Sequence, residues 1–167
     1  MAKRIDPAKL PEIVGTLYPP PFDKPCRSRA RKKLGDAAGL TQFGINLLRL
    51  PPGAWSSQRH WHTEQDEFVY VLAGEVVLVT DGGEEILKAG DCAGFKAGDR
   101  DGHHLQNRGK TNALVLEIGS RTKSEQGEYS DIDMAFNTDA RAMYLHKDGR
   151  PYDDLKRRGP DDPQEEA

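Results

Sequence analysis

Cysteine is scarce in this sequence: only Cys26 and Cys92 occur among its 167 residues. Two cysteines are too few for the disulfide framework of a small secreted fold. The N-terminus, residues 1–7, has no apolar segment of the signal-peptide type. We therefore expect a cytoplasmic protein with two free thiols, and a disulfide between Cys26 and Cys92 is the alternative.

Long hydrophobic runs are also missing. No apolar stretch approaches the roughly 18 residues that a membrane-spanning helix needs. Charge of one sign is not in excess either, because the formal net charge is only −3. We therefore expect neither a membrane nor a nucleic acid as a partner.

Hydrophobic residues make up 36% of the chain, which is low for a domain that is packed throughout. The shortfall lies mostly at the two ends, so the ordered core should be shorter than the chain. We divide the sequence into an extended N-terminal arm (residues 1–38), one central domain (residues 39–120) and a C-terminal extension (residues 121–167).

The N-terminal arm is marked by prolines, such as Pro19 to Pro21 and Pro25, and shows no sustained helical or strand periodicity. We expect the arm to wrap the domain or a neighbouring subunit, with residues 11–25 covering an open sheet edge. Its basic run from Arg27 to Lys33 is interpreted as solvated surface, and an anion or partner contact is the alternative.

The C-terminal extension becomes polar after Ser120. Residues 121–147 are expected to form a short helix or irregular surface segments. Residues 148–167 are rich in Asp, Arg, Lys and Pro, and we expect this tail to be mobile from Gly159 onward.

The central domain consists of short β-like runs separated by turn signals, such as Asp81-Gly82-Gly83, which favours a hairpin. The predicted strands are residues 43–50, 56–62, 67–72, 75–80, 84–87, 91–95, 103–106 and 113–119. Many short strands at about ten-residue spacing, without a helical stretch between them, indicate an all-β sandwich or barrel.

The most informative stretch of the chain contains His60 and His62. Residues two apart on a strand point to the same face, so these imidazoles share a polar face with Ser56 and Gln58, which become candidates for substrate binding. Glu67 follows at the head of the next apolar run. Two imidazoles and one carboxylate at one point are typical of a transition-metal site with open coordination positions.

Residues 43–119 resemble the cupin superfamily through two motifs. The first motif is a glycine, a spacer, His-x-His, a glutamate and a second glycine. It is matched here by Gly53, His60, His62, Glu67 and Gly74, with six spacer residues after Gly53 where five are usual.

The second cupin motif is matched by Gly98, His103 and Asn107. It departs from the family pattern in two ways: Lys96 stands where proline is usual, and four residues instead of two separate Gly98 from His103. His104 is therefore an alternative to His103 as the residue that faces the metal, although the spacing to Asn107 favours His103.

The resemblance implies a double-stranded β-helix, also called a jelly-roll barrel, with one divalent transition metal per chain near the barrel mouth. The ligands that it implies are His60, His62, Glu67 and His103. Three histidines and one carboxylate suit Fe, Mn, Ni, Co or Zn, and the sequence does not choose among these metals. The stretches 34–40 and 131–134 are similar to a bacterial single-domain subgroup, some members of which are likened to sugar-phosphate isomerases.

Four protein ligands leave an octahedral metal two open positions for a small oxygenated metabolite. The first hypothesis is a metal-dependent enzyme similar to the sugar-phosphate isomerases, and the alternatives are an iron-dependent dioxygenase and a non-catalytic metal- or small-ligand-binding cupin. The catalytic residues are unknown: an isomerase needs a base, for which Glu67 or Glu117 is available, although Glu117 also fits a surface position. Candidates for binding an anionic substrate are Arg49, Arg59, Lys96 and Arg100.

Alternation along residues 67–72 predicts that Val69 and Val71 line the barrel interior. The opposite face carries three large apolar side chains, Phe68, Tyr70 and Leu72. Because this outer face is so apolar, we expect it to be buried by the arm, by residues 132–145 or by a second subunit. We therefore expect a homodimer.

Overall fold

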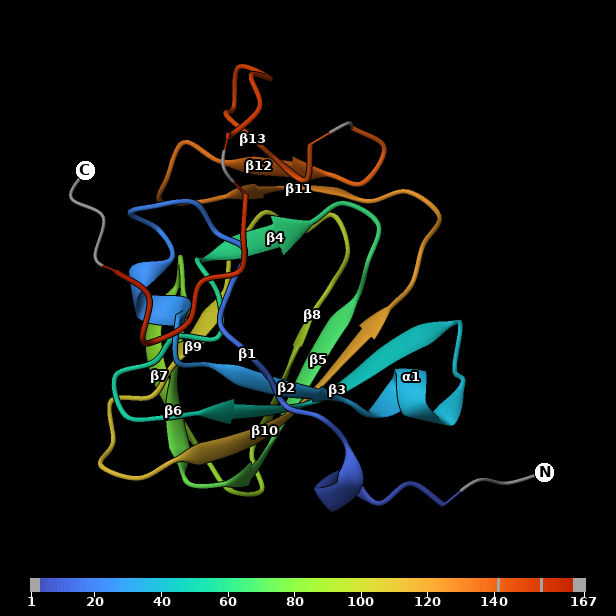
Figure 1. Ribbon diagram of the computed structural model, residues 1–167, viewed down its shortest axis with the longest axis vertical. Helices are drawn as coiled ribbons and strands as arrows, with labels where there is room; N and C mark the ends of the chain where they lie inside the picture. The colour runs from blue at the N-terminus through green and yellow to red at the C-terminus, as the bar shows by residue number, and fades with distance from the viewer. Residues whose placement is uncertain (1–3, 141, 154, 164–167) are drawn as a thin grey trace.

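The computed structural model describes residues 4–140, 142–153 and 155–163, and strands predominate among them (Figure 1). The helical elements are short: the 3-10 helices η1 (Pro7–Lys9) and η2 (Lys24–Cys26) and the α-helix α1 (Leu34–Ala38). The strands are β1 (Ile13–Val14), β2 (Ala30–Lys33), β3 (Phe43–Leu50), β4 (His60–His62), β5 (Glu67–Ala73), β6 (Glu75–Thr80), β7 (Gly83–Lys88), β8 (Cys92–Phe95), β9 (His104–Gln106), β10 (Ala113–Ser120), β11 (Gln126–Tyr129), β12 (Ala135–Asn137) and β13 (Tyr144–Leu145). The all-β prediction is confirmed.

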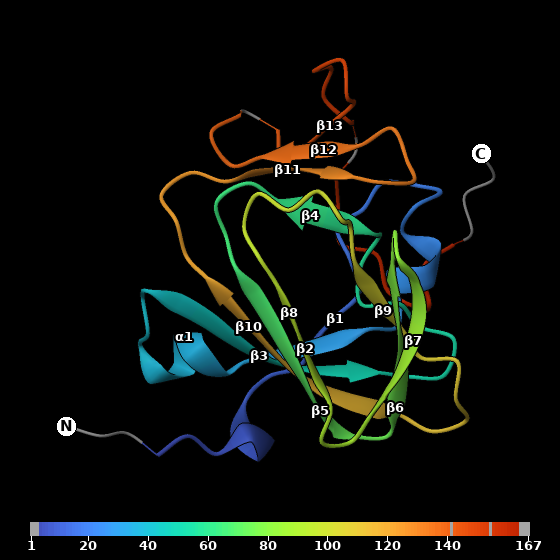
Figure 2. The same ribbon diagram turned by 180° about the vertical axis from the view of Figure 1, so that it is seen from behind.

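The barrel has two walls that face each other. One wall is a six-stranded sheet in the order β1-β2-β3-β10-β5-β8, and the opposite wall is the sheet β7-β6-β9 (Figure 2). A third sheet, β13-β12-β11-β4, lies across one end of the barrel (Figure 1). Every ladder between the described strands is antiparallel, as the predicted jelly-roll barrel requires.

The apolar core fills one end of the barrel only. On β3 and β10 the inward positions change from apolar Leu48 and Val115 to polar Asn46 and Glu117 two residues further toward β4. Val69 and Val71 are buried in this core, as alternation predicts. The core cluster consists of Leu48, Leu50, Ala54, Val69, Val71, Val76, Leu78, Leu87, Leu105, Ala113 and Val115. The polar inward positions leave the other end of the barrel available for a cavity.

The predicted strands of the central domain agree closely with the observed ones, and β3 and β6 begin and end where the sequence predicts. The largest difference is the run 56–62, of which only residues 60–62 form a strand. Ser56 and Gln58 make other bonds: the Ser56 amide donates to the Leu105 carbonyl, and the Gln58 side chain donates to the Phe22 carbonyl.

The N-terminal arm contains regular structure that the sequence reasoning missed. Residues 30–33 form β2, which pairs with residues 46–49 of β3. β1 pairs with the other edge of β2. The edge of β3 is therefore covered by residues 30–33, and residues 13–14 add one further strand. Pairing with β3 supplies backbone partners that no local periodicity of the arm reveals.

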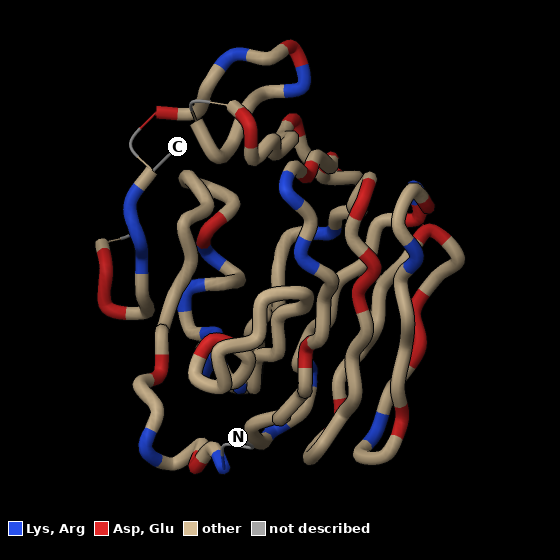
Figure 3. Tube along the Cα trace, turned by 90° about the vertical axis from the view of Figure 1, so that its right-hand side faces the viewer, with Lys and Arg blue, Asp and Glu red and all other residues tan. Residues whose placement is uncertain are grey.

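The basic run of the arm is not a solvated surface throughout, so that interpretation was wrong for its first members. Arg27 and Arg29 are 3% and 8% exposed. Arg27 pairs with the buried Asp23, and Arg29 donates to the carbonyls of Gly15 and Ser56. Over the chain as a whole, basic and acidic residues are interspersed, in line with the small net charge (Figure 3).

The C-terminal extension folds back on the arm. Of the short helix or irregular segments expected for residues 121–147, the structure has irregular segments, and between them lie the strands β11, β12 and β13, which were not predicted. β11 pairs with β4 so closely that a Cβ on Gly127 would lie 2.1 Å from the Trp61 carbonyl oxygen. The extension and the arm share a second apolar cluster that contains Tyr18, Cys26, Tyr129, Met134 and Tyr144. Mobility was predicted from Gly159 onward. Residues 164–167 of that range lie outside the described residues, and within residues 159–163 the carbonyls of Asp162 and Pro163 accept hydrogen bonds from Arg27.

The prediction drawn from the scarcity of cysteine agrees with the structure. Cys26 and Cys92 are both free, the first buried and the second exposed, so the alternative of a disulfide between them is wrong. No helix among the described residues is long and apolar enough to cross a membrane.

Candidate metal centre

Three strands bring the predicted metal ligands together at one end of the barrel. His60 and His62 come from β4, and Glu67 is the first residue of β5. His103 directly precedes β9 and pairs with His60 through two backbone hydrogen bonds of 3.2 and 2.9 Å. The buried Trp61 points away on the other face of β4, so alternation fixes both flanking imidazoles on the cavity side.

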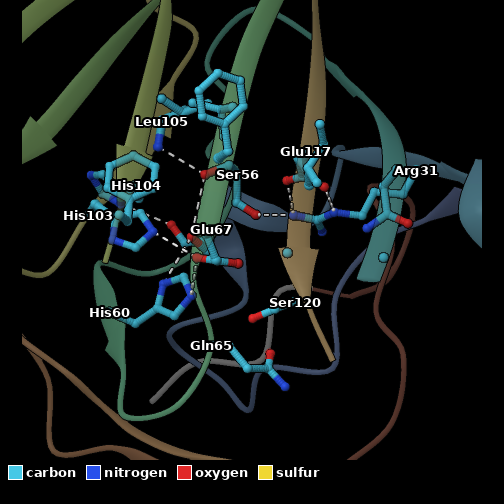
Figure 4. Close-up of a pocket in the computed structure, with 18 of the residues that line it drawn as sticks. Arg31, Ser56, His60, Gln65, Glu67, His103, His104, Leu105, Glu117 and Ser120 are labelled. Carbon is cyan, nitrogen blue, oxygen red and sulfur yellow. Dashed lines mark hydrogen bonds and ion pairs between the residues drawn. The ribbon is translucent and has the colours of Figure 1, made fainter. Parts of the chain in front are cut away.

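The three imidazoles converge on one carboxylate oxygen of Glu67. Its Oε2 lies 2.9 Å from Nε2 of His103, 3.4 Å from Nε2 of His62 and 4.0 Å from Nε2 of His60. Figure 4 shows the Glu67 carboxylate beside His60 and His103. Donor atoms of His60, His62 and Glu67 all lie within 4.8 Å of one another. This cluster is the candidate metal centre.

The electrostatics of the centre favour the protonation states that a metal ion needs. Burial lowers the pKa of His60 to about 3, against the opposing effect of the Glu67 carboxylate. For Glu67, burial works to raise the pKa, but the hydrogen bond from His103 and the neighbouring imidazoles bring it down to about 2. At neutral pH the centre therefore presents a neutral imidazole and an ionised carboxylate, which are the forms that bind metals.

Several buried nitrogens of the centre have no hydrogen-bond partner in the described part of the chain. They are both ring nitrogens of His62 and Nδ1 of His103. An unpaired buried polar atom costs about 1–3 kcal/mol, so native structures rarely keep several together. Of these atoms, Nε2 of His62 points toward Glu67 and would be satisfied by a metal ion at the centre, so the residues present fit a bound divalent transition metal.

His103 and His104 occupy different environments. The His103 ring stacks on Phe95 with a centroid separation of 3.5 Å and faces Glu67. The His104 ring packs against Trp55, and its Nδ1 lies 2.9 Å from the Ser57 carbonyl oxygen. The two candidates from the sequence are thus separated by geometry, and His103 is the one beside the carboxylate.

Aromatic side chains of the C-terminal extension close the centre from the outside. Tyr129 stacks on His60 with centroids 5.6 Å apart, and Phe136 lies 5.1 Å from the His62 ring. Sequence reasoning missed both residues. For Tyr129, the sequence offers one signal, the alternation of polar and non-polar residues from Gln126 to Tyr129.

A cavity of about 410 Å³ opens beside the centre, between β2, β3, β10 and the ligand residues (Figure 4). His60, Glu67 and His103 line it on one side, and Arg31 and Glu117 line it on another. A second cavity of about 260 Å³ touches the same centre from the side of β8 and is lined by His62, Glu67 and His103 among others. A small molecule in the larger cavity would therefore contact the ligand residues directly.

The two residues proposed for substrate binding have different positions. Ser56 lines the large cavity, although its Oγ already accepts a hydrogen bond from the Leu105 amide. Gln58 is buried, is bound to the arm through Phe22, and is not among the residues that line either cavity. The hydrogen bond from the Gln58 side chain to the Phe22 carbonyl links the barrel to the arm.

The cationic residues considered for an anionic substrate lie mostly away from the large cavity. Arg49 and Arg59 pair with carboxylates elsewhere, Arg100 lies over the Trp61 ring, and Lys96 lines the smaller cavity. Arg31 and Lys33 on β2 line the large cavity instead. Sequence reasoning placed both in a solvated run, because the pairing of β2 with β3 was not foreseen.

Comparison with known proteins identifies the family. A crystal structure from Silicibacter pomeroyi, described as a sugar phosphate isomerase from a cupin superfamily, superposes with a TM-score of 0.86 at 44% sequence identity, and the match covers 92% of this chain and 100% of that one. The chain belongs to the cupin superfamily. The family profile described as a cupin domain matches residues 46–119 of this cupin.

Other relatives of this cupin carry different descriptions. A structure from Acidithiobacillus ferrooxidans, described as a putative sugar phosphate isomerase, matches at 32% identity with a TM-score of 0.63, covering 66% of this chain and 70% of that one. An oxalate-binding protein of Thermotoga maritima is 34% identical over 71 residues, which are 42% of this chain and 56% of that protein. The chain spans about half the length of the curated relatives that it matches.

Proposed function

We propose that this cupin is a metal-dependent enzyme that isomerises a small anionic, oxygenated metabolite of the sugar-phosphate class. The observation that carries the proposal is the convergence of three imidazoles on Glu67 beside a cavity of about 410 Å³ whose other wall bears Arg31. The likeness to two structures described as sugar phosphate isomerases supports the choice of reaction.

The ligands in this proposal are His60, His62, Glu67 and His103, holding one divalent transition metal per chain. Fe, Mn, Ni, Co and Zn all suit this donor set. When bound, the metal supplies a Lewis acid that polarises a carbonyl and orients the substrate. Phe95 supports the centre by stacking on His103 and keeping its ring in one orientation.

Arg31 and Glu117 perform the remaining steps in this proposal. Arg31 and Lys33 bind the anionic end of the substrate, since both lie on the cavity wall. Glu117 holds Arg31 through both carboxylate oxygens. When the substrate anion takes over Arg31, Glu117 is released to accept a proton from the carbon beside the carbonyl and then to return it to the former carbonyl carbon. The proton of the neighbouring hydroxyl moves to the former carbonyl oxygen, so that no proton is gained or lost overall. Both residues thus act on the substrate from the wall opposite the ligands.

A second candidate is a non-catalytic protein that binds a small dicarboxylate. It is favoured by the 34% identity over 71 residues to the protein described as oxalate-binding. The same centre and cavity would serve, but no proton transfer would follow. The iron-dependent dioxygenase, an alternative in the sequence analysis, stays a prediction from the sequence.

The test uses untagged protein purified without chelators. Metal content is measured by mass spectrometry, and the native metal is then restored before a panel of aldose and ketose phosphates is screened by proton NMR. We expect about one metal per chain and interconversion of at least one pair, both lost in His62→Ala. Oxalate binding in calorimetry without any turnover would instead favour the second candidate, and absence of metal after loading with Fe, Mn, Ni, Co and Zn would overturn both.

We also propose that the chain forms a homodimer through the outer face of β5. Phe68, Tyr70 and Leu72 are 39%, 39% and 47% exposed, so neither the arm nor residues 132–145 cover them. Of the three alternatives predicted to bury these side chains, a second copy of the chain is the one left. The cytoplasmic location expected from the N-terminus stays a prediction.

A further inference from the structure

Glu125 is a buried carboxylate that lies behind the metal centre, in the C-terminal extension and outside the matched cupin domain. It directly precedes β11, the strand that pairs with β4 (Figure 1). Its side chain is only 3% exposed, and its Oε1 lies 3.7 Å from Nδ1 of His62. A buried carboxylate therefore faces one of the four ligand residues from the side opposite Glu67.

The two nitrogens of the His62 ring face two different carboxylates. Nε2 is 3.4 Å from Glu67 inside the centre, and Nδ1 is directed toward Glu125. Both nitrogens are buried, and neither has a hydrogen-bond partner among the described residues. A histidine that binds a metal through one nitrogen nearly always donates from the other to a carboxylate or carbonyl, which sets the tautomer and strengthens the ligand.

Glu125 is held rigidly enough for that role. Its Oε1 accepts hydrogen bonds from the amides of Thr63 and Gln126, at 2.9 and 3.0 Å, and its Oε2 accepts one from Glu64 at 3.2 Å. The Thr63 hydroxyl donates to Oε1 at 3.1 Å. Because each of these contacts is a donation to the side chain, the carboxylate is oriented before any metal arrives.

We propose that Glu125 is a positioning residue that keeps His62 protonated at Nδ1, so that Nε2 is free to bind the metal. The inference rests on the proposed metal centre and extends it into the C-terminal extension. The separation of 3.7 Å is longer than a hydrogen bond, so the contact in this structure is electrostatic. The competing explanation is that Glu125 merely fixes the turn at Thr63 and Glu64.

The test compares Glu125→Gln with Thr63→Val. The first variant keeps the size of the side chain and removes its charge. The second removes one hydroxyl contact to Glu125 but leaves His62 and the carboxylate in place. Untagged, chelator-stripped proteins are titrated with Co²⁺, and binding is followed by visible absorption and by calorimetry, with His62→Ala as the reference for a lost ligand.

We expect Glu125→Gln to weaken Co²⁺ binding by about 10- to 100-fold and Thr63→Val by less than about threefold. Equal losses in the two variants, or no loss in Glu125→Gln, would overturn the role. If wild-type protein binds no Co²⁺, the proposed function fails first, and the two failures are thereby distinguished.

A second measurement does not depend on the stability of any variant. In stripped wild-type protein, long-range proton–nitrogen NMR reports which ring nitrogen of His62 carries the proton. The positioning role predicts protonation at Nδ1. Protonation at Nε2 would overturn it, whatever the variants do.

Discussion

Arg31 on β2 and Glu117 on β10 form a two-pronged ion pair across β3. Nε of Arg31 lies 2.7 Å from Oε2 of Glu117, and Nη2 lies 2.8 Å from Oε1. Burial opposes the charge on Arg31, but the Glu117 carboxylate raises its pKa above the ordinary value. The pair stands on the wall of the large cavity, so a positive and a negative group are held there with defined orientation.

The pair predicts opposite effects of its two neutral variants on anion binding. Glu117→Gln removes the negative charge that neutralises Arg31, so binding of inorganic phosphate should tighten by about tenfold. Arg31→Gln should weaken it by about tenfold, since a hydrogen bond to a charged group is worth about 1.5–3 kcal/mol. Calorimetry with phosphate measures both. The same direction of change in the two variants would contradict an anion-binding role for Arg31.

The ligand assignment predicts different consequences for two adjacent histidines. His103→Ala should remove most of the bound metal, because loss of one ligand of a mononuclear site weakens it sharply. His104→Ala should keep the metal, because that ring packs on Trp55 away from Glu67. Metal content by mass spectrometry after equal loading makes the comparison. Retention in His103→Ala with loss in His104→Ala would reverse the assignment.

The outer face of β5 predicts the state of association. Tyr70→Lys should convert a dimer into a monomer, since a buried unpaired charge at a subunit contact is strongly unfavourable. Ile86→Lys is the control, because Ile86 is 57% exposed but belongs to the sheet β7-β6-β9. Sedimentation at micromolar concentration gives the mass of each. A monomeric wild-type protein would refute the proposal outright.

The second apolar cluster predicts sensitivity to alkali. Burial raises the pKa of the Cys26 thiol from 9.0 to about 11, and it also raises the pKa of Tyr144. Between pH 9 and 11 the unfolded chain releases the thiol proton and the folded chain keeps it. The free energy of unfolding therefore falls as pH rises, by about 2 kcal/mol for this thiol.

Urea unfolding at pH 8 to 11 measures this slope. At pH 8, Cys26→Ala should be less stable than the wild type by about 1 kcal/mol, because removal of the buried sulfur atom leaves a small void. Its stability should decline less steeply than that of the wild type above pH 9. Parallel curves for the two proteins would show that the Cys26 thiol is not the titrating group.

Local alternation explains why so much of the barrel could be predicted. A strand with one buried face places an apolar residue at every second position, so the residues of a strand themselves indicate it. Residues 43–50 and 75–80 are two such runs, and both strands begin and end as predicted. The same rule put His60 and His62 on one side. It failed for residues 56–59, where side chains and backbone bind neighbours distant in sequence.

Other errors came from contacts between distant segments. The charges of Arg27 and Arg29 favour a surface position, yet both are buried, because Asp23 and backbone carbonyls of the arm and barrel compensate them. The C-terminal extension forms strands because β4 offers it an edge. Neither partner is visible in the local pattern.

The sequence by itself determined the barrel and three residues of the candidate metal centre, because strand alternation and the spacing from His60 to Glu67 act over a few residues. Only the tertiary structure decided that His103 and not His104 faces Glu67, that Arg31 and Glu117 line the cavity, and that Glu125 lies behind His62. These relationships join segments far apart in the chain. They depend on which strands pair, and pairing is set by the packing of the whole domain rather than by any single stretch of residues.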